Sequence, residues 1–330
     1  MDVVVVGATG AVGQVMLKVL EERRFPVGRL RLVASARSAG RVVEALGQRV
    51  TLEVASPEVF SPGGLALFSA GAGTSQTWCP VAAERGALAV DNSSAWRMDP
   101  SVPLVVPEVN SARITPRGII ANPNCSTIQM LVALKPLHDA AGLEQVVVST
   151  YQAISGKGAR ALEEFELQRA ADARGETPNH AVLPGVLSQN LLTDWKHEDS
   201  GWAEEELKMI QESRKILELP ALRVTPTCVR VPVPNGHSEA VWARFSRPIG
   251  RDEALALLGA APGISLDPRV GPGLHPQPRS FSGRDDVAVG RVRVDPSDPH
   301  ALAFWVVGDN LRKGAATNAV QIAEHAFGVR

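Results

Sequence analysis

Residues 2–13, Asp2-Val3-Val4-Val5-Val6-Gly7-Ala8-Thr9-Gly10-Ala11-Val12-Gly13, decide the fold of the first part of the chain. The leading residues are mostly β-branched and apolar, which is typical of a strand buried on both faces of a parallel sheet. Three glycines follow, and a helical pattern comes next. A strand, a glycine-rich turn and a helix let the backbone approach a pyrophosphate at a helix N-terminus. The spacing is G-x-x-G-x-x-G rather than G-x-G-x-x-G, so a tight turn that binds nothing is the alternative.

Further apolar runs continue this alternation of strands and helices. A helical pattern covers residues 77–85, among others. The alternation predicts an α/β fold with a doubly wound parallel sheet, whose ligands bind at the carboxyl ends of the strands. Residues 69–73 and 91–94 fall at such ends, and Arg97 just beyond them is a candidate anion binder or else a surface charge. The further strands are predicted at residues 30–34, 50–54, 65–69 and 88–90.

The end of the second predicted strand indicates which dinucleotide is bound. A cofactor with a free ribose 2′-hydroxyl usually meets an acidic residue about 20 residues after the glycines. Here the sequence is Ser35-Ala36-Arg37-Ser38, without an acid. Arg37 and Ser38 can hold a 2′-phosphate through charge and hydroxyl donation, which favours NADP over NAD. A solvated arginine on a loop is the alternative.

Cys125 is the candidate nucleophile. The apolar run 118–121 predicts a strand, and residues 127–134 predict a helix. The segment Asn122-Pro123-Asn124-Cys125-Ser126 therefore places Cys125 at or just before the first helical turn, where free N–H groups and the macrodipole favour an anion. A small buried residue at a tight turn is the alternative. We expect this segment to join two domains.

The other two cysteines are interpreted as packing residues. Cys79 lies near the start of the helix predicted over residues 77–85, and no acid–base partner is indicated beside it. Cys228 lies in a segment that alternates like a strand, so we expect it in the core. Neither cysteine forms a C-x-x-C pair with another, so the sequence predicts no zinc site and no disulfide framework.

The second half of the chain supplies candidate groups for binding a carboxylate and moving a proton. Strands are predicted at residues 222–231 and 239–245, with Arg230 and His237 on either side of the connection between them. We expect this Arg and His to meet at the ends of adjacent strands, although His237 alone is equally consistent with a loop residue. Glu205 and Lys208 are three residues apart on the helix predicted over residues 204–217, where a solvated ion pair is the alternative to a binding role.

Composition excludes several classes of function. The chain has 330 residues, of which 45% are hydrophobic and 21% charged. Its net charge of -1 provides no excess of positive charge that would favour binding to nucleic acid or an acidic membrane. No H-E-x-x-H or G-x-x-x-x-G-K-[ST] motif is present, so metal catalysis and Walker-type phosphate transfer are not supported. An odd number of cysteines and the absence of a secretory pattern predict a cytoplasmic protein.

Together these motifs resemble the aspartate-β-semialdehyde dehydrogenase family over residues 3–323, nearly the whole chain. Each motif is modest by itself, whereas the set in this order and with these separations is specific. The motifs are the glycine turn 7–13, Ser35-Ala36-Arg37-Ser38, Asp91-Asn92-Ser93-Ser94, Asn122-Pro123-Asn124-Cys125-Ser126, Tyr151-Gln152-Ala153-Ile154-Ser155-Gly156, Glu205-Glu206-Leu207-Lys208, Arg230 with His237, and residues 310–316.

The resemblance implies a role for each matching residue. Cys125 is expected to be the nucleophile that becomes an acyl-thioester, His237 the acid–base group, and Gln152 the residue that orients the substrate. Arg230 is expected to bind the α-carboxylate and Glu205 the amino group, while Arg97 and Lys208 form a phosphate subsite. The residues expected to bind NADP are Gly7, Thr9, Gly10, Ala11, Val12, Arg37, Ser38, Ser155, Gly156 and Asn310.

The resemblance also implies a domain organisation. Residues 1–124 and 314–330 are expected to form an NADP-binding Rossmann-like domain, because in related proteins the last helix returns to the nucleotide-binding domain. Residues 125–313 are expected to form a second α+β domain that carries catalysis, substrate binding and dimerisation. Small-molecule substrates are the expected partners, in a homodimer or a tetramer that binds neither nucleic acid nor membrane. The segment 195–202 matches no motif of the family.

The implied reaction is the NADPH-dependent reductive dephosphorylation of L-4-aspartyl phosphate to L-aspartate 4-semialdehyde through a cysteine thioester. It belongs to the pathway that leads to lysine and diaminopimelate, threonine and methionine. The nearest alternative is N-acetyl-γ-glutamyl-phosphate reductase, whose substrate is longer and carries an acylated amine. A glyceraldehyde-phosphate-type enzyme is disfavoured by Arg37. A catalytically dead dinucleotide-binding regulator is disfavoured by the intact catalytic set.

Overall fold

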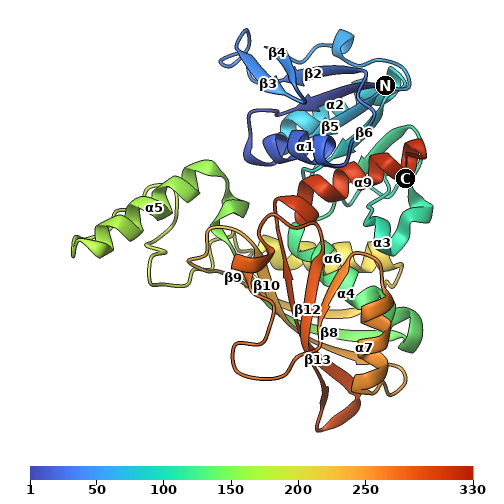
Figure 1. Ribbon diagram of the computed structural model, residues 1–330, viewed down its shortest axis with the longest axis vertical. Helices are drawn as coiled ribbons and strands as arrows, with labels where there is room; N and C mark the ends of the chain where they lie inside the picture. The colour runs from blue at the N-terminus through green and yellow to red at the C-terminus, as the bar shows by residue number, and fades with distance from the viewer. Residues whose placement is uncertain (330) are drawn as a thin grey trace. The chain divides into compact units, whose positions relative to one another are not determined.

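The computed structural model describes residues 1–329 and divides into two compact units. One unit comprises Met1–Asn124 and Gly314–Arg330, and the other comprises Cys125–Lys313. Figure 1 follows the chain through both units, which are described separately below. Each unit is built around one β-sheet, with seven strands in the first unit and six in the second.

The sheet of the first unit has the strand order β3-β4-β2-β1-β5-β6-β7. From β4 to β7 every neighbouring pair is parallel, which confirms the predicted parallel sheet. The order changes direction at β1, so the ends of β1 and β5 form the switch point of a doubly wound sheet. The strands are β1 (Asp2–Val6), β2 (Arg29–Val33), β3 (Val42–Ala45), β4 (Gln48–Glu53), β5 (Leu65–Phe68), β6 (Leu88–Asp91) and β7 (Gly118–Ala121).

The edge hairpin β3–β4 was not predicted. Its two-residue turn, Leu46-Gly47, has positive φ at both residues, 50° and 68°. Such a turn favours Asn or Asp before the glycine, because those residues tolerate the left-handed region better than leucine does. Leu46 therefore carried no turn signal. Only the β4 part of this hairpin, predicted at residues 50–54, was found from the sequence.

Helices of the first unit cover its sheet and join its two chain segments. Helices α1 and α9 pack together in one core cluster. Arg23, which follows α1, donates two hydrogen bonds to Glu324 on α9 at 2.9 and 2.6 Å, so the C-terminal segment is tied to the start of the chain. The helical segments are α1 (Ala11–Glu22), η1 (Pro57–Val59), α2 (Ala72–Glu84), α3 (Pro107–Asn110), η2 (Ser111–Arg113) and α9 (Thr317–Phe327), while η4 (Arg312–Ala316) spans the boundary at which the chain returns from the second unit.

The predicted start of α2 was wrong. The helix begins at Ala72 rather than near residue 77, because Gly71 can act as its N-cap and residues 72–76 continue the helical backbone. Cys79 consequently lies in the middle of the helix and is fully buried, instead of near an N-terminus that would activate its thiol. The structure thus places Cys79 in a core cluster, as the packing interpretation predicted.

The second unit contains a mixed sheet with the strand order β11-β12-β13-β10-β8-β9. β8 pairs parallel with β9 and antiparallel with β10, so the prediction that β9 and β10 are adjacent was wrong. The segment between Arg230 and His237 instead crosses the end of β8. The strands are β8 (Leu143–Gln152), β9 (Arg223–Arg230), β10 (His237–Phe245), β11 (Ile264–Asp267), β12 (Val287–Asp295) and β13 (Asp298–Gly308).

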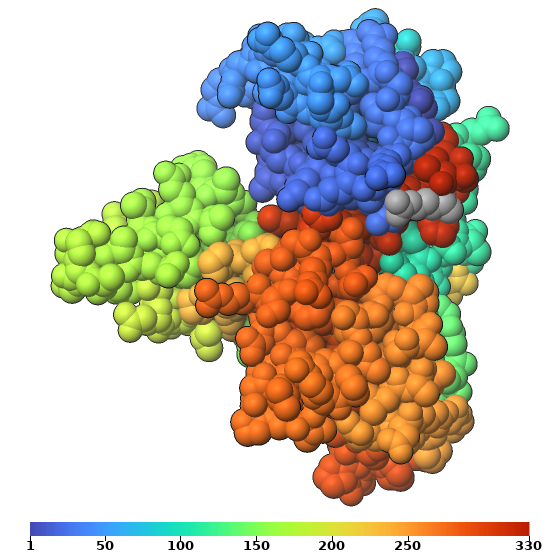
Figure 2. All heavy atoms as spheres, in the orientation of Figure 1, coloured from blue at the N-terminus to red at the C-terminus, as the bar shows by residue number. Residues whose placement is uncertain are grey.

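Helices α4, α6 and α7 pack against one face of this sheet. Residues that point to the other face stay partly exposed, among them Val147, which is 40% exposed, and the neighbouring rings of Tyr151 and Trp305. Helix α5 extends away from the sheet in Figure 1, and Figure 2 shows the same segment as a protruding lobe. The helical segments are α4 (Cys125–Ala141), η3 (Ile154–Lys157), α5 (Ala159–Ala173), α6 (Glu204–Leu217), α7 (Arg251–Ala260) and α8 (Pro278–Phe281).

No helix within residues 1–329 combines the length and the apolar character that crossing a bilayer would require.

Candidate active site

Cys125 is the first residue of α4, as the sequence predicted. The loop before it is anchored because Asn122 is fully buried and donates hydrogen bonds to Asn92 and to the backbone oxygen of Ala315. Cys125 is partly exposed, whereas Cys79 and Cys228 are buried, and burial raises the pKa of both buried thiols. The helix N-terminus favours a thiolate. Cys125 is therefore the cysteine best suited to nucleophilic attack.

Four strand ends bring the predicted catalytic groups to one edge of the six-stranded sheet. Gln152 at the end of β8 pairs with Arg230 at the end of β9. His237 begins β10 and pairs with Gly308 at the end of β13. These two residue pairs lie at the same end of neighbouring strands, so their side chains gather at one edge of the sheet.

Helix α4 reaches the same edge of the sheet. A Cβ atom added to Gly308 would lie 2.7 Å from Oε1 of Gln129, so this glutamine packs directly over the strand end that pairs with His237. Gln129 is one helical turn after Cys125 and lies on the same side of α4. The start of α4 thus brings Cys125 to the region of His237.

His237 is fully buried and has a defined ring orientation. Its Nδ1 accepts a hydrogen bond from the backbone N–H of Ala153 at 3.0 Å. An accepting Nδ1 places the proton of the neutral ring on Nε2. Burial, together with the positive charge of Arg230, holds the pKa of His237 well below its ordinary value. Within residues 1–329, Nε2 has no hydrogen-bond partner and can donate to a substrate.

Gly156 leaves space beside two of these groups. A Cβ atom at this position would lie 3.5 Å from Nε2 of His237 and 3.5 Å from Nη1 of Arg230. The two nitrogens are therefore at most twice that distance apart. A larger side chain at position 156 would cover both groups, so the glycine keeps them accessible to a small molecule.

Arg230 is almost completely buried at the end of β9. Its Nη1 donates to the backbone oxygen of Ala153 at 2.8 Å, and its Nε donates to Asp194 at 3.3 Å. The ring of Trp195 stacks on the guanidinium, with 4.5 Å from Cζ to the ring centroid. Sequence reasoning missed Asp194 and left Trp195 unassigned. Both lie in an irregular segment, whose contact with Arg230 depends on a bridge between Leu192 and Arg230.

Gln152, Glu205 and Lys208 form one chain of contacts. Nε2 of Gln152 donates to Glu205 at 3.1 Å, and Nζ of Lys208 lies 3.4 Å from the other oxygen of the same carboxylate. The predicted pairing of Glu205 with Lys208 on one face of a helix is present in α6. The glutamate side chain is only 7% exposed, so this pair is not the solvated surface pair that was the alternative.

The loop after β8 is held by a second polar network. Ser155 accepts a hydrogen bond from Nδ2 of Asn310 at 2.9 Å, and Oδ1 of Asn310 accepts the backbone N–H of Gly236 at 3.0 Å. Ser155 and Asn310 are both buried. The structure thereby brings together three of the residues predicted to bind the cofactor from this unit, namely Ser155, Gly156 and Asn310.

The remaining predicted cofactor residues lie at the carboxyl ends of β1 and β2 in the first unit. Gly7 has φ 85°, and a Cβ atom there would lie 2.3 Å from the backbone oxygen of Ser69, so only glycine fits the switch point. The N-terminus of α1 follows Gly10 without a side-chain cap. Arg37 is exposed beyond β2, next to Ser38. Exposed residues of the turn include Thr9, Gly10 and Ala11, with Val12 partly buried behind them.

Arg97 belongs to the first unit, and Lys208 belongs to the second. Arg97 is only 8% exposed and donates from Nε to the backbone oxygen of Asn122 at 2.9 Å. Its Nη2 donates to the backbone oxygen of Asn92 at 3.1 Å. These contacts hold the guanidinium at the loop that leads to Cys125. They rule out the alternative that Arg97 is a solvated surface charge.

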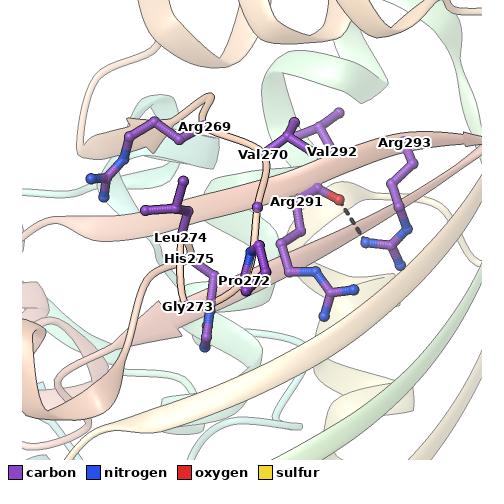
Figure 3. Close-up of a pocket in the computed structure, with 10 residues that line it drawn as sticks. Arg269, Val270, Pro272, Gly273, Leu274, His275, Arg291, Val292 and Arg293 are labelled. Atoms are coloured by element: carbon purple, nitrogen blue, oxygen red, sulfur yellow. Dashed lines mark hydrogen bonds between the residues drawn. The ribbon is translucent and has the colours of Figure 1, made fainter.

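A separate cavity of about 410 Å³ lies along β12 and the loop before it. Figure 3 shows that the guanidinium of Arg269 points in a different direction from those of Arg291 and Arg293. Arg269 is paired with Asp267, and Arg293 donates to the backbone oxygen of Arg291. No residue predicted for catalysis or binding lines this cavity. Within residues 1–329 there is also no cluster of three or more side chains suited to a metal ion.

Comparison with known proteins shows which family the chain resembles. Residues 2–116 match the family described as semialdehyde dehydrogenase, NAD binding domain, and residues 134–313 match semialdehyde dehydrogenase, dimerisation domain. The chain is 50% identical to aspartate-semialdehyde dehydrogenase of Aquifex aeolicus and 47% identical to that of Bacillus subtilis, in each case over 98% of this chain and 96% of the relative.

Solved structures show the same similarity. The crystal structure of aspartate semialdehyde dehydrogenase II from Vibrio cholerae, complexed with ASA, superposes with a TM-score of 0.94 at 44% identity and covers 99% of this chain and 98% of that chain. The enzyme from Candida albicans, solved with NADP, gives a TM-score of 0.74 at 25% identity, with 98% and 97% covered. The identities of 50% and 47% to the relatives from Aquifex aeolicus and Bacillus subtilis, over 98% of this chain, show that the chain belongs to the aspartate-semialdehyde dehydrogenase family.

Proposed function

We propose that this protein interconverts L-4-aspartyl phosphate and L-aspartate 4-semialdehyde, with NADPH as the reductant in the biosynthetic direction. The observation that carries the proposal is the edge of the six-stranded sheet where His237, Arg230 and Gln152 meet, with the start of α4 packed over it. A nucleophile at a helix start, a neutral proton-bearing ring and a buried guanidinium are what thioester chemistry on a small amino-acid aldehyde requires.

In the oxidative direction, the Cys125 thiolate attacks the aldehyde carbon, and a C–S bond forms. The carbonyl oxygen takes up negative charge, which Nε2–H of His237 stabilises by donating a hydrogen bond. NADP+, when bound, supplies the hydride acceptor that turns the hemithioacetal into a thioester. The negatively charged oxygen re-forms the C=O bond as the hydride leaves, so this step releases no proton and Nε2–H of His237 keeps donating to that oxygen. The acid–base role expected for His237 stays a prediction.

Phosphate then attacks the thioester carbon, the C–S bond breaks, and the Cys125 thiolate is restored. We assign the phosphate to Arg97 and Lys208. The α-carboxylate is assigned to Arg230, since its guanidinium is buried and still has N–H groups for a bidentate pair. The carboxylate of Glu205 accepts hydrogen bonds from the substrate ammonium group. Gln152, which donates a hydrogen bond to Glu205, orients the substrate.

The residues of the first unit fit a dinucleotide. Gly7 allows the close approach of the two strand ends, and the uncapped N-terminus of α1 offers N–H groups to a pyrophosphate. Arg37 stands where an acidic residue would otherwise meet a ribose 2′-hydroxyl. This donor set favours NADP, and the NADP-bound relative from Candida albicans is consistent with it.

The match to a dimerisation domain supports a homo-oligomer. We infer a homodimer that uses the uncovered face of the six-stranded sheet, where Val147, Tyr151 and Trp305 keep apolar surface in contact with solvent. Replacing Val147 with Lys should shift the protein towards monomer in analytical ultracentrifugation. A tetramer built from such dimers and a cytoplasmic location stay predictions.

The experiment that tests the function is phosphate-dependent formation of NADPH from L-aspartate 4-semialdehyde. Cys125→Ala should abolish turnover and the covalent thioester seen by mass spectrometry while NADP still binds. Cys79→Ala, which removes a thiol from the other unit, is the matched control and should remain active. Activity confined to N-acetyl-glutamate semialdehyde would assign the protein to the alternative reductase, and turnover by Cys125→Ala would refute the nucleophile.

A further inference from the structure

Asp194 lies beside the proposed carboxylate-binding arginine. Its side chain is 0% exposed and accepts hydrogen bonds from Nε of Arg230, at 3.3 Å to one oxygen and 3.4 Å to the other. Lys157 contacts the same residue twice, through an ion pair of 2.9 Å with the carboxylate and a hydrogen bond of 3.0 Å to its backbone oxygen. A buried carboxylate between two cations has a defined position, because each contact restricts it from a different side.

Three different contacts hold the guanidinium of Arg230. Asp194 engages Nε, the backbone oxygen of Ala153 engages Nη1 at 2.8 Å, and the ring of Trp195 stacks on the planar face. A stacked, planar guanidinium has lost its freedom to rotate. Within residues 1–329, Nη2 of Arg230 makes no hydrogen bond, so the end of the guanidinium that carries Nη1 and Nη2 is the edge that remains available.

We propose that Asp194 is a positioning residue that determines which edge of Arg230 meets the substrate carboxylate. By engaging Nε, it blocks the side edge of the guanidinium and presents the Nη1–Nη2 end. The cluster of Arg230, Lys157 and Asp194 carries two positive charges and one negative charge. Its excess of one positive charge matches a single carboxylate. This inference rests on the proposed function, in which Arg230 binds the substrate.

The test compares two aldehydes that differ only in the carboxylate, L-aspartate 4-semialdehyde and 3-aminopropanal. Asp194→Asn should raise the KM for the semialdehyde roughly tenfold or more, because a mispositioned buried charge loses most of its pairing. Its kcat/KM for 3-aminopropanal should change by less than about twofold. Asp199→Asn, an exposed change in the same segment, is the matched control and should keep both values.

Equal losses with both aldehydes would show a merely structural role and overturn the proposal, as would an unchanged KM. If Asp194→Asn does not fold, Lys157→Gln releases one restraint on Asp194 and should raise the KM for the semialdehyde in the same direction. An unchanged KM in that variant also refutes the proposal.

A binding measurement separates this proposal from the proposed function. L-2-aminobutyrate carries the amino and carboxylate groups of the substrate without its aldehyde, so its binding in calorimetry needs no turnover. Asp194→Asn should bind it roughly tenfold more weakly than the unmodified protein. Failure of the unmodified protein to oxidise the semialdehyde would reject the reaction, while the binding ratio would still decide the role of Asp194. Equal binding by both proteins would reject the positioning role alone.

Discussion

The backbone N–H of Ala153 donates a hydrogen bond to Nδ1 of His237 at 3.0 Å, and the backbone oxygen of the same residue accepts a hydrogen bond from Nη1 of Arg230 at 2.8 Å. One peptide segment at the end of β8 therefore spaces the ring and the guanidinium. The first bond also decides the protonation of the ring, because an Nδ1 that accepts an N–H cannot carry a proton. His237 is consequently a neutral ring whose Nε2–H can donate a hydrogen bond.

This neutral ring predicts a pH-dependent stability. Burial and Arg230 hold the pKa of His237 well below 6.5, so below about pH 6.5 the unfolded chain binds a proton that the folded protein does not. The contribution of His237 to stability should therefore fall as the pH decreases through this range, by at most about 1.4 kcal/mol per pH unit. His237→Asn should lack this slope in urea unfolding between about pH 5 and 6.5. His180→Asn, an exposed control, should keep it.

Glu239 predicts the opposite slope. It lies two residues after His237 on β10, is fully buried, and has no hydrogen-bond partner for either oxygen within the described residues. Burial raises its pKa well above 4.5, although Gln129 opposes the shift, so the folded protein retains a proton that the unfolded chain loses. Stability should fall as the pH rises above about 4.5, and Glu239→Gln should remove this loss.

The stabilisation by Glu239→Gln should therefore grow with pH, by at most about 1.4 kcal/mol per unit. Urea midpoints measured from about pH 5 to 8 provide the readout. Glu163→Gln, an exposed change in the same unit, should leave the profile as it is. A constant difference between Glu239→Gln and the unmodified protein at every pH would show that Glu239 titrates alike in both states.

Alkylation should discriminate among the three thiols. Iodoacetamide reacts with thiolates, and burial raises the pKa of Cys79 and Cys228, whereas Cys125 is partly exposed at a helix N-terminus. The folded protein should take up label at Cys125 alone, as read by peptide mass spectrometry. Cys79 and Cys228 should react after unfolding in guanidinium chloride. Rapid labelling of Cys228 in the folded protein would contradict its burial in the core.

Arg37→Leu should weaken NADP binding roughly tenfold or more, because a charge-assisted hydrogen bond to the 2′-phosphate contributes about 1.5–3 kcal/mol. NAD binding should stay nearly the same, since NAD lacks this phosphate. Fluorescence titration with both nucleotides measures the two constants. Arg41→Leu, which changes another exposed arginine four residues later, is the control. An equal loss for NADP and NAD would reject contact between Arg37 and the 2′-phosphate.

Arg230→Leu should raise the KM for the semialdehyde by roughly a hundredfold, with a smaller effect on the KM for phosphate. Lys208→Met should show the reverse pattern in steady-state kinetics, because it removes a cation from the proposed phosphate subsite. Circular dichroism should accompany the Arg230 variant, since the change leaves Asp194 buried with one cation fewer. If the Arg230 variant lost only phosphate affinity, the two subsites would have to be exchanged.

Local signals in the sequence were sufficient for much of the fold. The apolar run of β1 and the glycines after it predict a strand, a turn and a helix, because burial on both faces and a close backbone approach leave few alternative residue types. Helix α6 was predicted with its observed bounds, Glu204–Leu217. Cys125 was likewise predicted at a helix start. In each case the signal lies within one element and its cap.

The sequence did not predict the features that depend on contacts between residues far apart in the chain or that lack a local marker. The order β10-β8-β9 was not predictable, because the connection from Arg230 to His237 is as short as that of two neighbouring strands. The turn at Leu46 lacks the residues that mark its type. Nothing in the irregular segment around Asp194 indicates that it contacts Arg230.

The sequence by itself determined the parallel dinucleotide-type sheet, the helix that begins at Cys125 and the family, because residue periodicity and motif order carry that information. Only the tertiary structure decided that β8 separates the two strands and that Ala153 holds both His237 and Arg230. It also decided that Asp194 and Trp195 contact the guanidinium and that Glu239, two residues after His237, is fully buried. The physical reason is that burial, ring protonation and charge pairing depend on which strand ends meet, and that is set by long-range hydrogen bonding rather than by local propensity.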